Sequence, residues 1–211
     1  EDFAGYSEVK RSIKSRAFPG GTVADEMTER FGLSKRTGLL LYGPPGCGKT
    51  YLSRCISDQQ GLCFIHDPNA VINSAESVFS LFEIARKVRK AVLFFDDIEI
   101  IFKQRASFRS DEMLTQYFLS QLDGHYVNDE FTFIGATNYP EKIDTAFYRP
   151  GRFDNLVYLP LPDEPSRRSL FDYYLKGKPV SSIDFGELAS KSEFCSCADI
   201  KYFCLKAAHS C

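Results

Sequence analysis

Residues 43–50 read Gly-Pro-Pro-Gly-Cys-Gly-Lys-Thr and match the phosphate-loop pattern G-x-x-x-x-G-K-[ST] at every fixed position. An apolar run at 39–42 precedes the motif, and a helix-like apolar pattern follows it. In this strand–loop–helix context, glycine-rich backbone turns its N–H groups toward an anion at the positive end of a helix. Lys49 is expected to reach the outer phosphates and Thr50 to hold Mg²⁺. The stretch therefore predicts a nucleoside triphosphate site.

Polar side chains follow two later apolar runs. Asp96 and Asp97 come directly after 91–95, which has the unbroken apolar character of a buried parallel strand, and Asn138 follows 131–137. Ligands of open α/β sheets bind at the carboxyl ends of the strands. We therefore expect Asp96 to lie on the Mg²⁺ side of the same site and Asn138 to orient an attacking water.

Four motifs in this order resemble the AAA ATPase family, in the clade that remodels protein complexes. They are residues 43–50, Leu-Phe-Phe-Asp-Asp-Ile-Glu at 93–99, Gly-Ala-Thr-Asn at 135–138 and Arg-Pro-Gly-Arg-Phe-Asp at 149–154. The resemblance extends from Asp2 almost to the C-terminus. It implies an α/β P-loop NTPase fold, a five-stranded parallel sheet with flanking helices, followed by a small C-terminal helical lid.

The resemblance also implies which residues contact ATP. Its opening segment lies against the adenine, its phosphate loop holds the phosphates, and its lid reaches the ribose and base. The expected contacts are Asp2, Ala4, Gly5, Pro45, Gly46, Cys47, Gly48, Lys49, Thr50, Tyr51, Tyr174, Cys197 and Ala198. Arg149 and Arg152 resemble the arginine fingers of the family, which act on nucleotide held by the neighbouring subunit. Phosphoryl transfer needs fixed positive charge of this kind.

The chain departs from the family pattern at the water-activating position. Asp97 stands where the family usually has Glu, so its carboxylate is one methylene shorter. A carboxylate that lies about one ångström too far from the attacking water can lower the rate on the order of a hundredfold. The second AAA domain of the N-ethylmaleimide-sensitive fusion factor has a similar Asp-Asp and serves mainly in assembly. Either the site is slow, or the backbone shifts so that Asp97 serves as the base.

Two further departures concern substrate grip and base selectivity. Substrate-threading relatives carry an aromatic–apolar pair in a longer loop after the second strand, whereas residues 66–76 contain no aromatic side chain beyond His66, and Val71 and Ile72 are the only grip candidates. Cys197 replaces a glycine beside the ribose, and Tyr174 stands where a His often faces the adenine. Stacking by Tyr is as good as stacking by His.

Composition excludes several classes of function. The net charge of −2 implies no nucleic-acid or membrane field, and no apolar run is long enough to cross a bilayer. The seven cysteines are an odd number, so a reducing, intracellular and cytoplasmic setting is expected rather than a disulfide framework. A cluster at the C-terminus suggests either buried small hydrophobes or a zinc or redox site; it comprises Cys195, Cys197, Cys204 and Cys211.

Cys47 is a separate case, because it lies in the phosphate loop beside Lys49. Inward N–H groups, the lysine and a helix N-terminus would all stabilise a thiolate. We therefore expect a lowered pKa and a reactive thiol, against the alternative of a small loop residue.

The chain divides into two predicted domains. Residues 1–160 form the AAA α/β nucleotide-binding domain, and residues 161–211 a helical lid that is expected to be truncated in a module excised from a longer protein. Three prolines at 160–165 mark the break. We place strands near 37–42, 62–66, 91–96, 131–137 and 155–159, and helices near 6–16, 48–60, 75–89 and 110–123.

Two functions remain open at this point. The first is an ATPase (ATP and water to ADP and phosphate) acting with Mg²⁺ in a homo-oligomeric or mixed AAA ring, a hexamer, to remodel or unfold a protein substrate, without nucleic acid or membrane insertion. The second is a low-turnover nucleotide-binding assembly module paired with a more active AAA domain. Asp97 favours the second function, and Arg149 with Arg152 favours the first.

Overall fold

The computed structural model describes residues 3–16, 38–66, 75–88, 90–100, 109–123, 131–178 and 183–209. Three predictions fall on residues outside these ranges and stay predictions. They are the adenine contact of Asp2, the grip candidates Val71 and Ile72, and Cys211 of the cysteine cluster.

Five parallel strands form one sheet in the order β2-β3-β4-β1-β5. The strands are β1 (Gly38–Tyr42), β2 (Cys63–Ile65), β3 (Ala91–Phe95), β4 (Phe131–Thr137) and β5 (Asn155–Tyr158). The predicted α/β fold is confirmed, and every predicted strand end lies within one residue of the observed one. The register pairs Tyr42 with Thr137 and Phe95 with Gly135, so the segments after β1, β3 and β4 leave the sheet at one edge.

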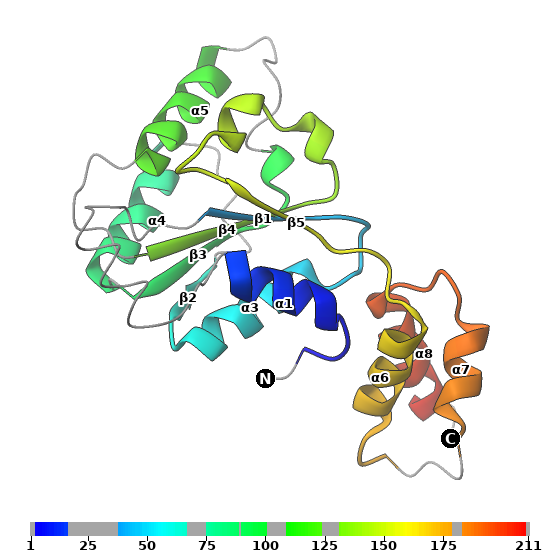
Figure 1. Cartoon of the computed structure of the whole chain (residues 1–211). Helices are drawn as coiled ribbons and strands as arrows, with labels where there is room; N and C mark the ends of the chain where they lie inside the picture. The colour runs from blue at the N-terminus through cyan, green and yellow to red at the C-terminus, as the bar shows by residue number, and fades with distance from the viewer. Residues whose placement is uncertain are drawn as a thin grey trace.

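Helices cover both faces of this sheet (Figure 1). α1 (Ser7–Arg16) and α3 (Lys49–Gln60) lie on one face, and α4 (Ala75–Val88) and α5 (Arg109–Leu122) lie on the other. Because side chains alternate along a strand, Val92 and Phe94 join the core on the α1–α3 face, while Leu93 and Phe95 join the core on the α4–α5 face. Two covered faces explain why the strands are apolar throughout rather than alternating.

Three helices follow β5 and form the lid: α6 (Glu164–Leu175), α7 (Phe185–Lys191) and α8 (Cys197–His209). Asp163 caps α6 by accepting from the Ser166 N–H at 3.0 Å. The buried Arg167 side chain donates to the carbonyls of Pro162 and Ala189, at 2.9 Å each, and so ties α6 to the linker and to α7. Apolar lid residues belong to the same buried cluster as α1 and α3, so lid and sheet share a core.

No helix in the described ranges combines the length and the apolar character that a bilayer crossing needs.

Candidate nucleotide-binding site

The phosphate loop connects β1 to α3 and touches the lid. Gly46 and Gly48 adopt left-handed φ values of 76° and 89°, which favour glycine. A Cβ on Gly46 would lie 2.7 Å from the Ser196 Oγ, so close approach to the lid also requires glycine there. The Ala198 N–H donates to the Gly46 carbonyl at 3.0 Å. The loop and the first turn of α8 are therefore joined through backbone.

Lys49 lies beneath this loop with its ammonium group satisfied by three acceptors. Its Nζ donates to the carbonyls of Gly43 and Pro44, at 2.9 and 2.8 Å, and to Asn138 Oδ1 at 2.6 Å. Burial lowers the pKa of Lys49, and the carboxylates of Asp96 and Asp97 act in the opposite direction. These bonds hold the cation in place between the loop and the end of β4.

Thr50 and Asp96 form the candidate Mg²⁺ site. The Thr50 hydroxyl donates to Asp96 Oδ2 at 2.7 Å, which joins the start of α3 to the end of β3. Mg²⁺ in such enzymes takes one or two protein oxygens and completes its shell with phosphate and water. One hydroxyl and one carboxylate oxygen side by side fit that donor set.

Asp97 adopts a backbone conformation that is rare outside glycine. Its φ is 44°, and its N–H donates to Asp96 Oδ1 at 3.1 Å. Asn138 Nδ2 lies 3.4 Å from Asp97 Oδ1, at the long end of the hydrogen-bonding range. Burial raises the pKa of Asp97, and the nearby charges of Asp96 and Glu99 raise it further. A strained residue of raised basicity beside the phosphate loop suits a functional role.

These groups line one pocket of about 380 Å³ between the loop and the lid. Tyr174 and Ala198 line it from the lid. Its walls comprise Pro45, Gly46, Gly48, Lys49, Thr50, Tyr51, Asp96, Asp97, Asn138, Tyr174, Cys197, Ala198 and Lys201. Lys201 was not anticipated from the sequence. It lies three residues after Ala198, on the same face of α8, and that spacing was the available signal.

Within the described ranges, five predicted site residues are not in the pocket walls. Ala4 and Gly5 precede α1 and pack toward the lid, where a Cβ on Gly5 would lie 2.7 Å from Ser166. Cys47 is completely buried behind the loop. The two arginines, Arg149 and Arg152, follow the 3₁₀ helix Thr145–Tyr148 on the way to β5.

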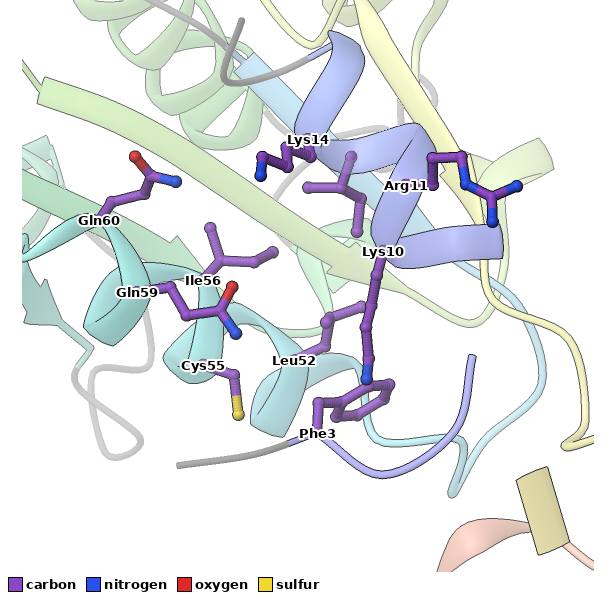
Figure 2. Close-up of a pocket in the computed structure, with 10 residues that line it drawn as sticks. Phe3, Lys10, Arg11, Lys14, Leu52, Cys55, Ile56, Gln59 and Gln60 are labelled. Carbon is purple, nitrogen blue, oxygen red and sulfur yellow. The ribbon is translucent and has the colours of Figure 1, made fainter. Parts of the chain in front are cut away.

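A second pocket of about 440 Å³ lies between α1 and α3 (Figure 2). Its floor is apolar, with Phe3 and Leu52 among its lining residues, and its polar groups are those of Lys10, Arg11, Lys14, Gln59 and Gln60. It has no carboxylate to bind Mg²⁺ and no glycine-rich backbone to hold phosphate. Although it is larger, it lacks the chemistry of a triphosphate site.

The expectation of a reactive Cys47 thiol is wrong. Burial raises the pKa of Cys47 to about 11, and the neighbouring Cys197 raises it as well, against a smaller lowering by Lys49. The Sγ atom lies 3.9 Å from the Pro45 carbonyl. Because the side chain is fully buried and is not among the residues that line the pocket, desolvation outweighs the positive charge that the motif supplies.

We therefore predict that Cys47 is a slow target for N-ethylmaleimide in the folded protein. With a pKa of about 11, only about one thiol in a thousand is ionised at pH 8, and that fraction rises about tenfold per pH unit up to pH 10. The exposed Cys63 on β2 should label first. Peptide mass mapping of a time course at pH 7, 8 and 9 measures this, and early labelling of Cys47 at pH 7 would contradict the buried position.

The two arginines have different surroundings. Arg152 is buried and bidentate to Asp123, with Nε–Oδ1 at 2.5 Å and Nη2–Oδ2 at 2.6 Å, and its Nη1 donates to the Ala146 carbonyl at 2.6 Å. Arg149 is exposed, and its guanidinium has no hydrogen bond or ion pair within the described part of the chain. The turn between them is closed by Gly151, at a φ of 85°.

The sheet order, the phosphate loop and the converging polar groups define a P-loop nucleoside triphosphate-binding protein. The sequence profile of the ATPase family associated with various cellular activities (AAA) matches residues 39–161, more than half of the chain. The chain belongs to the AAA family.

Proposed function

We propose that this AAA module binds ATP with Mg²⁺, hydrolyses it to ADP and phosphate, and does so within a ring oligomer, a hexamer of one or several kinds of chain, that remodels protein substrates. One observation carries the proposal: Lys49, the Thr50–Asp96 pair, Asp97 and Asn138 converge on one pocket that the lid completes.

Each group has a role in that reaction. The loop N–H groups and Lys49 bind the β- and γ-phosphates, while Thr50 and Asp96 would hold Mg²⁺. When bound, Mg²⁺ neutralises charge that develops on the phosphates. Asp97 accepts a proton from the attacking water, and Asn138, bonded to Lys49, orients that water.

Arg149 is the better candidate for a finger that acts on a neighbouring subunit. It is exposed and free of ion pairs within the described residues, whereas the Arg152 guanidinium is bound within its own chain. Arg152 would then support the turn that presents Arg149, since its contacts to Asp123 and Ala146 fix that segment. A finger that acts on a neighbouring subunit requires assembly of subunits, whichever of the two arginines provides it.

Removing Arg149 should lower ATP turnover about a thousandfold or more without weakening nucleotide binding, since arginine fingers contribute about 10³–10⁵ to turnover. Turnover per protomer of the parent should rise with protein concentration. The measurement is steady-state ATPase rate across a concentration series of parent and Arg149→Ala, with oligomeric state followed by light scattering. Turnover that is independent of concentration down to a verified monomer would contradict action between subunits.

Arg152→Ala is the matched control. It removes the same charge three residues away but breaks contacts inside the chain, so it should lower the free energy of unfolding by about 1–3 kcal/mol. Thermal unfolding of both variants separates the two effects. A stable Arg152→Ala variant with turnover as low as that of Arg149→Ala would return Arg152 to the role of a finger.

The second candidate is a nucleotide-binding assembly module with slow turnover. It is favoured by the short side chain of Asp97. It is also favoured by the distance of 3.4 Å between Asn138 Nδ2 and Asp97 Oδ1, which makes the hydrogen bond between these two residues weak. Under this alternative, ATP binding promotes oligomer formation while ATPase activity stays low at every concentration. The same concentration series distinguishes the two functions.

A further inference from the structure

Tyr6 lies where three parts of the molecule meet. It is buried, with 6% of its surface exposed, and lies between the opening segment and α1. Its φ of 54° is a left-handed value that costs free energy in any residue other than glycine. Gly5 before it is also left-handed and packs tightly against Ser166 of α6. The surrounding contacts must therefore hold this turn in place.

The hydrogen bonds of the Tyr6 N–H and hydroxyl lead to the lid or to its linker. Its N–H donates to Ser166 Oγ at 3.0 Å, and its hydroxyl donates to the Pro160 carbonyl at 2.9 Å, just after β5. The same hydroxyl lies 3.4 Å from Cys197 Sγ, at the start of α8. The Cys197 thiol in turn lies 3.5 Å from the Cys47 carbonyl in the phosphate loop. We call Tyr6, Pro160, Ser166 and Cys197 the Tyr6 junction.

The protons at this junction can be assigned. The single hydroxyl proton of Tyr6 goes to the Pro160 carbonyl, because an O–H···O bond at 2.9 Å is stronger than a contact with sulfur. The Cys197 thiol then donates either to the Tyr6 oxygen or to the Cys47 carbonyl. In either case the Cys197 side chain adds a bond between the start of α8 and the Tyr6 oxygen or the phosphate-loop backbone.

We infer that the Tyr6 hydroxyl is a positioning group, which holds the lid against the phosphate loop and thereby sets how long a nucleotide stays bound. The inference rests on the proposed function, because it concerns the pocket that would hold ATP. Lid residues Tyr174, Ala198 and Lys201 line that pocket together with Gly46 and Lys49 of the phosphate loop. A lid that moves away from the loop would open the pocket along this boundary. Tyr6 touches neither the pocket nor the reacting atoms, so its effect passes through the lid.

The test is Tyr6→Phe, which deletes the hydroxyl and keeps the ring that packs 5.3 Å from Phe3. Loss of one hydrogen bond of this kind corresponds to about a three- to tenfold change in an equilibrium constant. We expect Kd and the dissociation rate of a fluorescent ADP analogue to rise by that factor, and kcat at saturating ATP to stay unchanged. A residue that only supported the fold would lower kcat and stability together.

Two further variants examine the same junction from the lid. Ser166→Ala removes the acceptor of the Tyr6 N–H and should reproduce the faster dissociation, whereas Ser169→Ala, on the same helix but bonded to the Pro165 carbonyl, should retain the parental rate. The Tyr6→Phe, Ser166→Ala double variant should lose less than the sum of the two. Should Tyr6→Phe fail to fold, Ser166→Ala against Ser169→Ala still decides. The matched control is Tyr148→Phe, because the Tyr148 hydroxyl also donates to a proline carbonyl, that of Pro140 at 2.7 Å, away from the lid.

The outcomes separate this inference from the proposed function. Faster dissociation in Tyr6→Phe but not in Tyr148→Phe supports the positioning role. If Tyr6→Phe and Ser166→Ala release nucleotide at the parental rate while Lys49→Ala loses binding, the Tyr6 junction is overturned and the nucleotide site stands. If the parent itself binds no nucleotide, both are overturned.

Discussion

Replacing Lys49 with alanine should weaken ATP binding about a hundredfold or more. The substitution removes a cation that three acceptors hold beneath the phosphate loop, and charge-assisted hydrogen bonds are worth about 1.5–3 kcal/mol each. It also removes the hydrogen bond that Lys49 donates to Asn138 Oδ1, so hydrolysis of any ATP that still binds should fall as well. Titration with a fluorescent ATP analogue gives the affinity of parent and variant.

The control is Lys90→Ala, which removes an exposed lysine just before β3 and should bind ATP like the parent. Thermal unfolding without nucleotide shows whether the Lys49 variant is folded. A folded Lys49→Ala protein with parental affinity would show that the loop does not bind the triphosphate, and the assignment of the pocket would be wrong.

Asp97→Asn should slow ATP hydrolysis about a hundred- to ten-thousandfold while ATP remains bound, since this is the contribution of a general base. The amide keeps the shape of the side chain and loses its ability to accept a proton. Single-turnover hydrolysis with preloaded ATP measures the chemical step directly. Unchanged hydrolysis in Asp97→Asn would mean that another group activates the water.

Asp97→Glu tests whether the short carboxylate limits the reaction. An extra methylene advances the carboxylate by about one ångström, a displacement that can change a rate by on the order of a hundredfold. We expect faster single-turnover hydrolysis, with nucleotide affinity unchanged. If the glutamate variant is no faster, the φ of 44° at Asp97 already brings its carboxylate to the water, and the slow-turnover alternative loses its main support.

Local patterns were sufficient for the sheet and for most of the pocket. The apolar run at 91–95 predicted β3 because a strand covered on both faces needs apolar side chains at every position. The carboxyl ends of parallel strands share one edge, and this explains why Asp96 and Asn138 could be placed together from sequence alone. Lid residues Tyr174 and Ala198 came instead from the resemblance to a family.

Other features depended on how deeply a side chain is buried and on which residues it contacts, and a sequence motif specifies neither. The motif surrounds Cys47 with positive charge, yet its thiol is buried behind the loop and its pKa is raised to about 11. The motif gives no reason to distinguish Arg149 from Arg152. In the structure, Arg152 is bound to Asp123, which is distant from it in sequence. Lys201 gained its place from the packing of α8 against the loop.

The sequence by itself determined the strand–loop–helix unit, the carboxylates at the strand ends and the membership of the AAA family, because each depends on residues close together in the chain. Only the tertiary structure decided which charges are buried, which arginine is bound to Asp123, and which residues contact the lid. Those outcomes depend on desolvation and on contacts between residues far apart in the chain, such as Tyr6 with Pro160 and Cys197. Short-range pattern specifies the chemistry of the site, and long-range packing sets the charge and position of each group in it.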